Sequence, residues 1–309
     1  MEILKRPKIK LCEDREIKED SLGVLHDFVR VLRRDFCDLN IFFHKLPQIS
    51  FEATDRSKLS RDYIMAEYDI LCRKIYYDKK YFKDAIMHEL LHLASTVIYN
   101  NRIYSGISQI DLDTNEVFGV GANEALTCIL DDKYFGDYTE TKGESLRYSY
   151  HILKSIMEYI PMLFGEDEVF DHYFKADLPG FLEMLSLYIE PDKALTFMMA
   201  LDNIHGCARV EMSKGYLGPI ATKILFDNYR YAMDVIGELY LTAVYSQYHQ
   251  ENIDEEQLYC SIDYINRIMN VQLRCVYLPF IRSKVYKQHE LYQLNKNIED
   301  KVIKKLSKQ

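Results

Sequence analysis

The segment His88-Glu89-Leu90-Leu91-His92 combines residue types and a spacing that are typical of a metal site. Two histidines four residues apart lie on one face of a helix, so both imidazoles can reach the same ion. Glu89 lies beside that face, where its carboxylate can accept a proton from a water at the metal without binding the metal itself. The chemistry predicted is metal-assisted hydrolysis with Glu89 as the base.

The residues around this motif predict a buried helix. The pattern is helical from Lys83 to about Tyr99, and apolar residues leave only a narrow polar stripe through His88 and His92. These apolar residues are Ile86, Met87, Leu90, Leu91, Leu93, Ala94, Val97 and Ile98. A five-residue motif can occur by chance, but histidines and a glutamate are costly on an apolar helix unless they are paired or bind a metal. We therefore favour the metal site.

Glu124 is the candidate for a third ligand, because a catalytic zinc takes three protein ligands and keeps one position open. It lies in the segment Gly119–Thr127, where Gly121 permits a tight turn and Asn123 is a typical N-cap. A helix is predicted from Asn123 to about Phe135, with Glu124 in its first turn. The alternative is that Glu124 only stabilises the helix, because acidic residues in a first turn interact favourably with the helix dipole. The histidine pair makes the ligand role the better explanation.

A helix with HELLH followed by a helix bearing Glu124 resembles the gluzincin type of zinc metallopeptidase, to which thermolysin-like enzymes belong. The segments Ser105–Gln109 and Gly119–Thr127 more closely resemble a set of bacterial HExxH proteins, in which a hairpin precedes an Asn-Glu-(small)-x-Thr-Glu segment. The resemblance covers about residues 70–190. It implies that His88, His92 and Glu124 are the zinc ligands and that Glu89 is the catalytic base.

One position departs from the family's pattern. An acidic residue one turn after the ligand glutamate often steadies a zinc-bound histidine, and this chain has Cys128 there. Loss of such a partner typically costs ~10–100-fold in metal affinity or activity. Either Asp131, a further turn along the helix, compensates or the activity is weak. Cys128 itself is expected to be a buried core thiol.

A hydrogen-bond donor that faces the developing oxyanion is also expected. Tyr148, Tyr150 and His151 share one predicted helix, and the resemblance to the bacterial set favours Tyr150. With 25 tyrosines in the chain, a packing role is the alternative for any one of them. His205 is the other candidate, although a histidine before a glycine also suits the C-terminus of a helix.

The secondary structure expected around these residues predicts an α+β fold that is mostly α. A helix from Ser21 to Asp38 and strands at 48–52 and 73–78 precede the histidine helix, and a hairpin turning at Asp113-Thr114-Asn115 follows it. Later helical periods cover 146–163, 169–174, 181–189, 191–204, 219–247 and 254–269. The polar segment 136–143 is the predicted boundary between an α+β zinc-binding catalytic subdomain (1–140) and a helical subdomain (141–309).

Composition narrows the class of protein. The 309 residues carry a net charge of −9 and no long basic block, which argues against nucleic-acid binding. Neither a signal peptide nor an apolar run of ~20 residues is present, so no membrane association is predicted. Seven scattered cysteines without a C-x-x-C motif indicate free thiols in a reducing cytoplasm.

The leading hypothesis is a cytoplasmic metallopeptidase with one zinc ion that hydrolyses a peptide or protein substrate. A second hypothesis is a regulatory protease that cuts one partner protein. The third is a non-catalytic, zinc-stabilised scaffold that binds a protein partner through its helical half. Cys128 keeps the scaffold hypothesis open, and Glu89 argues against it because a structural site has no use for an unligated carboxylate there. No oligomeric state is predicted.

Overall fold

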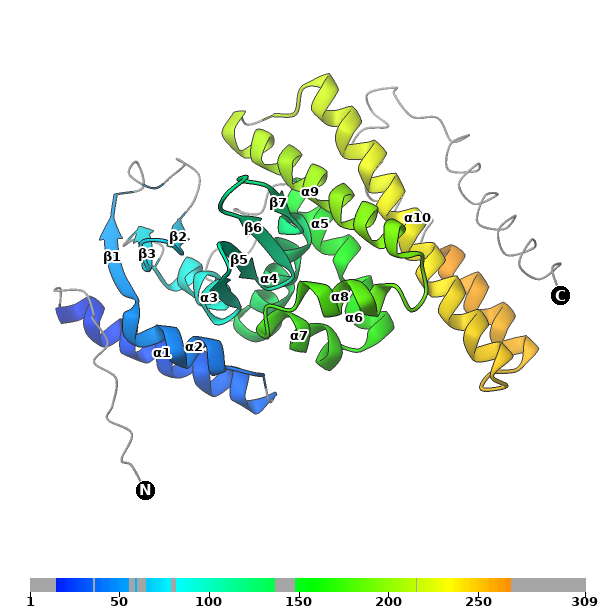
Figure 1. Ribbon diagram of the computed structural model, residues 1–309, viewed down its shortest axis with the longest axis horizontal. Helices are drawn as coiled ribbons and strands as arrows, with labels where there is room; N and C mark the ends of the chain where they lie inside the picture. The colour runs from blue at the N-terminus through cyan, green and yellow to red at the C-terminus, as the bar shows by residue number, and fades with distance from the viewer. Residues whose placement is uncertain are drawn as a thin grey trace. The chain divides into compact units, whose positions relative to one another are not determined.

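A computed structural model (Figure 1) describes residues 15–35, 37–55, 59, 65–78, 82–136, 148–214 and 216–267. As predicted, the fold is α+β and mostly α, with the strands in the N-terminal half. The chain divides into two compact units, Met1–Phe181 with Leu201–Phe226 and Leu182–Ala200 with Asp227–Gln309. The boundary predicted at 136–143 falls almost wholly outside the described residues.

Two N-terminal helices pack against the end of a later one. Helix α1 spans Arg15–Arg34 and α2 spans Asn40–Lys45, followed by a 3-10 turn at Leu46–Gln48. Phe28 of α1 lies 5.0 Å from Phe42 and 5.4 Å from Phe135, measured between ring centroids. All three rings are fully buried, so this aromatic cluster joins the first helices to the helix that carries Glu124.

The first sheet has three strands in the order β1-β3-β2. Strands β1 (Ser50–Thr54) and β3 (Lys74–Asp78) are parallel, while β2 (Ala66–Asp69) pairs antiparallel with β3 and forms an edge. Helix α3 (Phe82–Ala94) contacts β2 and β3 (Figure 1). Strands β1 and β3 match two predicted strands to within two residues, whereas β2 was not predicted.

The second sheet is an antiparallel meander of four strands. Its members are β4 (Thr96–Tyr99), β5 (Arg102–Ser105), β6 (Ser108–Asp111) and β7 (Val117–Phe118). The predicted hairpin around 113–115 is confirmed as β6 and β7. The predicted helix from Lys83 to Tyr99 is wrong after Ala94, because the β-branched residues that follow it form β4 instead.

Helix α4 spans Val120–Phe135 and begins three residues earlier than predicted. Gly119 takes the N-cap position with φ of +78°, a conformation that suits glycine. Asn123 is therefore not the N-cap; it is buried inside the helix, where its Oδ1 accepts a hydrogen bond from the Ile107 N–H at 3.3 Å. Glu124 consequently lies in the second turn of α4, not in the first.

The helices after residue 147 agree with the predicted helical periods. They are α5 (Tyr148–Met157), α6 (Tyr159–Phe164), α7 (Glu166–Phe174), α8 (Leu178–Leu185), α9 (Pro191–Lys214) and α10 (Pro219–His249), followed by helical residues 255–267. In the second unit, Lys193 Nζ donates to Glu238 Oε2 at 2.7 Å, which ties α9 to α10. Among the described helices, none combines the length and apolar character that crossing a membrane requires.

Candidate metal centre

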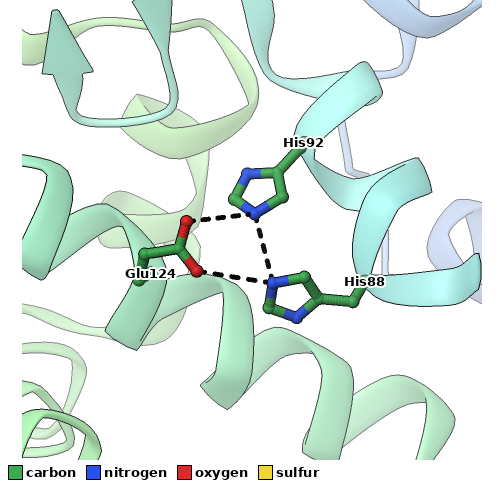
Figure 2. Close-up of side chains that lie close together, drawn as sticks. All are labelled: His88, His92 and Glu124. Carbon is green, nitrogen blue, oxygen red and sulfur yellow. Dashed lines mark hydrogen bonds and ion pairs between the residues drawn. The ribbon is translucent and has the colours of Figure 1, made fainter. Parts of the chain in front are cut away.

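The three residues predicted as zinc ligands meet at one point (Figure 2). His88 and His92 project from α3, and their Nε2 atoms lie 3.2 Å apart. Glu124 projects from α4 toward both rings, with Oε2 at 3.5 Å from His88 Nε2 and Oε1 at 3.5 Å from His92 Nε2. The contact between α3 and α4 therefore brings together residues that are more than thirty positions apart in the sequence.

The spacing and chemistry of these atoms fit a zinc ion. Bonds of ~2.0–2.1 Å in tetrahedral geometry place neighbouring ligand atoms about 3.3 Å apart. The separations of 3.2 and 3.5 Å lie close to that value. Two imidazoles and a carboxylate are a donor set that zinc prefers, and three such ligands leave a fourth position for a reactant. The three side chains are 13–22% exposed, so the site is only partly covered.

The protonation of the cluster follows from its burial and from the charge of Glu124. Burial alone lowers the pKa of both imidazoles, and the pKa of His92 falls to about 4. At His88 the carboxylates of Glu124, Glu89 and Asp131 together outweigh burial and raise the pKa to about 9. Burial would raise the pKa of Glu124, but the two histidines hold it well below its usual range. The carboxylate of Glu124 thus favours the charged form of His88, whereas burial favours the neutral form of His92.

Glu89 lies next to the three ligand residues but bonds elsewhere. Its Oε2 accepts a hydrogen bond from the backbone N–H of Tyr68 in β2 at 2.8 Å. Burial raises the pKa of Glu89 to about 7, with Glu124 adding to the increase and His88 and the Tyr68 amide opposing it. A carboxyl group with a pKa near neutrality can both accept and return a proton. This amide contact was not predicted, because β2 carries only a short and weak strand pattern.

Asp131 lies on the other side of His88. Its Oδ2 is 3.9 Å from His88 Nδ1, and its buried Oδ1 has no hydrogen-bond partner among the described residues. Burial raises the pKa of Asp131 to about 6. Cys128 is buried as predicted, and burial raises the pKa of its thiol well above the usual value. The acidic neighbour of a site histidine is thus Asp131, the residue considered as a replacement for the acid missing at position 128.

The structure describes the surroundings of only one of the two candidate oxyanion donors, His205. Tyr150 belongs to α5, but its side chain lies outside the described part of the chain, so its role stays a prediction. His205 is close enough to Glu124 for its charge to contribute to the low pKa of that carboxylate. Helix α9 continues past His205 to Lys214, so the alternative of a helix C-terminal histidine is wrong.

Buried hydroxyl groups connect the two ligand helices behind the site. The Tyr173 hydroxyl lies 2.8 Å from Thr127 Oγ1 of α4, and Ser95, the residue after α3, is close enough to oppose the rise that burial causes in the pKa of Tyr173. Thr127 Oγ1 donates to the Asn123 carbonyl at 2.8 Å, and Ser95 Oγ donates to the Leu91 carbonyl at 3.0 Å. This network fixes α3 and α4 to α7. It has no local sequence signal, because its members come from distant segments.

Comparisons of the chain with protein-family models, with curated proteins and with solved structures found no match.

Proposed function

We propose that this protein is a zinc-dependent metallopeptidase, a hydrolase that cuts peptide bonds in a peptide or protein substrate. The observation that carries the proposal is the convergence of His88, His92 and Glu124 at distances suited to one zinc ion. Glu89, on the same helix as the two histidines and free of the ligand set, adds the base that hydrolysis requires. A purely structural metal site gains nothing from such a carboxylate.

Zinc, when bound, supplies a Lewis acid that polarises the carbonyl of the scissile bond and lowers the pKa of water. Glu89 accepts a proton from the attacking water and passes it to the leaving amine, two tasks that suit a pKa of about 7. The Tyr68 amide holds one oxygen of that carboxylate, which leaves the other for proton transfer. We keep Tyr150 and His205 as the two candidates to donate a hydrogen bond to the carbonyl oxygen as it gains negative charge, and test His205 first because its charge reaches Glu124.

We further propose that the protein acts in the cytoplasm. The described cysteines, Cys37, Cys72, Cys128, Cys207 and Cys260, are all free thiols, as expected in a reducing compartment.

Metal content measured by mass spectrometry tests the site first. Wild type and Glu89→Gln are expected to purify with about one zinc per chain, since Glu89 is not a ligand, whereas His92→Ala and Glu124→Ala lose the metal. A wild-type chain without zinc, or zinc retained in Glu124→Ala, would overturn the ligand set.

Hydrolysis is tested separately with a peptide library, using Glu89→Gln as the matched inactive control that keeps the metal. Cleavage by the wild type and none by Glu89→Gln is the expected result. Zinc binding without cleavage of any peptide would favour the non-catalytic scaffold instead.

A further inference from the structure

The N-terminus of α4 is capped by a side chain from another helix. Asp202 of α9 accepts hydrogen bonds from the backbone N–H groups of Gly119, to Oδ2, and Gly121, to Oδ1, each at 2.7 Å. The first N–H groups of a helix have no partner within it and need acceptors from outside. Gly119 at the N-cap position has no side chain, and the first turn of α4 carries no acid. Asp202 therefore performs the task that a local N-cap performs in most helices.

The backbones of α4 and α9 also touch directly at this point. A Cβ atom added to Gly121 would lie 2.2 Å from the Leu201 carbonyl oxygen and 2.9 Å from the Asp202 nitrogen. Only glycine fits such an approach. The backbone contact fixes how closely α9 approaches α4, and the two hydrogen bonds fix how far it can slide along α4. Gly121 thus serves a helix contact and not the tight turn predicted from the sequence.

The capped end of α4 is the end that carries Glu124, three residues beyond Gly121. His205, three residues beyond Asp202 and hence on the same face of α9, is close enough to influence the charge of Glu124. Helix α9 is thus anchored over the part of α4 that faces the metal centre. A helix whose first turn has lost its cap unwinds from that end, and Glu124 is the first site residue that such unwinding reaches.

We propose that Asp202 is a positioning residue of the metal centre, holding Glu124 in register with His88 and His92 by capping α4. The inference rests on the metal site of the proposed function, although not on peptide hydrolysis. It predicts that metal affinity depends on Asp202, although no contact among the described residues joins Asp202 to any of the three ligand side chains. An ordinary structural cap would change stability and leave metal affinity unaltered.

Asp177 provides the matched control. Its Oδ1 accepts the Gly180 N–H at 3.0 Å in the first turn of α8, and its Oδ2 lies 2.9 Å from His172 Nδ1. It thus caps the first turn of another helix without a described bond to α3 or α4. Asp202→Ala, Asp202→Asn and Asp177→Ala are compared with wild type in the 309-residue chain. Zinc affinity is measured by competition with a chromogenic chelator, and stability by urea unfolding of the metal-free chains.

Asp202→Ala is expected to weaken zinc binding by ~10-fold or more, within the range seen when supporting partners of metal ligands are lost. Asp202→Asn, which keeps one acceptor oxygen, is expected to weaken it less. Asp177→Ala is expected to lower stability while zinc affinity stays within twofold of wild type. If Asp202→Ala does not fold, Asp202→Asn decides the question, with a loss of at least threefold expected.

Equal zinc affinity in the Asp202 variants and in Asp177→Ala would overturn the inference and leave the proposed function intact. A wild-type chain that binds no zinc would overturn both, so the two failures are distinguishable.

Discussion

His88 lies between two carboxylates. Glu124 faces its Nε2 at 3.5 Å and Asp131 faces its Nδ1 at 3.9 Å, so the ring is oriented from both sides. An imidazole that binds a metal through one nitrogen is usually held through the other by an acceptor, which fixes its tautomer. Asp131 can supply that acceptor, because its buried oxygens are not used elsewhere among the described contacts.

Asp131→Asn is expected to lower zinc affinity ~10-fold, because the amide provides no charge to hold the His88 ring. The measurement is chelator competition at neutral pH. Cys128→Ser is the control from the same turn of α4 and is expected to leave the affinity unchanged. Equal affinities for wild type and Asp131→Asn would mean that His88 is oriented by packing alone.

His205→Gln tests the proposed oxyanion donor. Removing one such donor lowers kcat by ~10²–10³-fold, and an interaction made only in the transition state lowers kcat and kcat/KM equally. The variant should keep its zinc, and its kinetics are measured on the first peptide that the wild type cleaves. Tyr150→Phe is measured beside it; if only that variant loses activity, the assignment passes from His205 to Tyr150.

The central residues of the site could be predicted because their relation is local. His88, Glu89 and His92 lie within five positions on one helix, and helical geometry alone places the two imidazoles together. Asp202 and the amide of Tyr68 could not be predicted in the same way. Their contacts span 83 and 21 positions, and depend on how α9 and β2 pack, which no local pattern specifies.

At the scale of elements, the Tyr173 hydroxyl of α7 bonds to Thr127 of α4 and lies near Ser95, the residue after α3. Tyr173→Phe is expected to lower the free energy of unfolding by ~1–2 kcal/mol, because it removes the buried bond to Thr127. Urea unfolding measures the loss. A double-mutant cycle with Thr127→Val isolates the shared bond, and strict additivity of the two changes would show that this contact contributes nothing.

The errors in element prediction have physical causes. Helical periodicity continues past Ala94, but the following β-branched residues pair with β5 through a turn at Asn100 and Asn101, both with φ above 0°. Asparagine is typical of such two-residue turns, so this Asn-Asn pair indicates a hairpin and not a continuing helix. The predicted start of α4 is wrong by three residues because Asp202, which caps the helix, is far away in the sequence. Local rules fail where tertiary contacts replace local ones.

At the scale of the whole molecule, Lys45 should make stability depend on pH. Its Nζ is buried without a hydrogen-bond partner among the described residues and lies 5.9 Å from the centroid of the Tyr68 ring. Burial, with a smaller contribution from Arg73, lowers the pKa of Lys45 from 10.5 to about 8. The unfolded chain thus binds more protons between these values, and the free energy of unfolding rises with pH across this window.

Lys45→Met is expected to raise the free energy of unfolding at pH 7 by ~1–2 kcal/mol and to reduce its increase between pH 8 and 10, because the buried ammonium is gone. Urea titrations at both ends of the window provide the measurement. Lys74→Met serves as the control, since the Lys74 ammonium pairs with Glu52 at 2.7 Å at the surface. A Lys45 variant as pH-dependent as wild type would contradict the assignment.

The first unit consists of two stretches of chain, Met1–Phe181 and Leu201–Phe226, with a segment of the second unit between them in the sequence. Synthesis proceeds from the N-terminus, so α3 and α4 leave the ribosome well before Asp202 and His205 are made. A nascent chain that ends before α9 contains the three candidate ligands, His88, His92 and Glu124. It lacks Asp202, which caps α4, and His205, which lies near Glu124. If the proposals above hold, tight zinc binding would therefore have to wait until the chain has been made past α9.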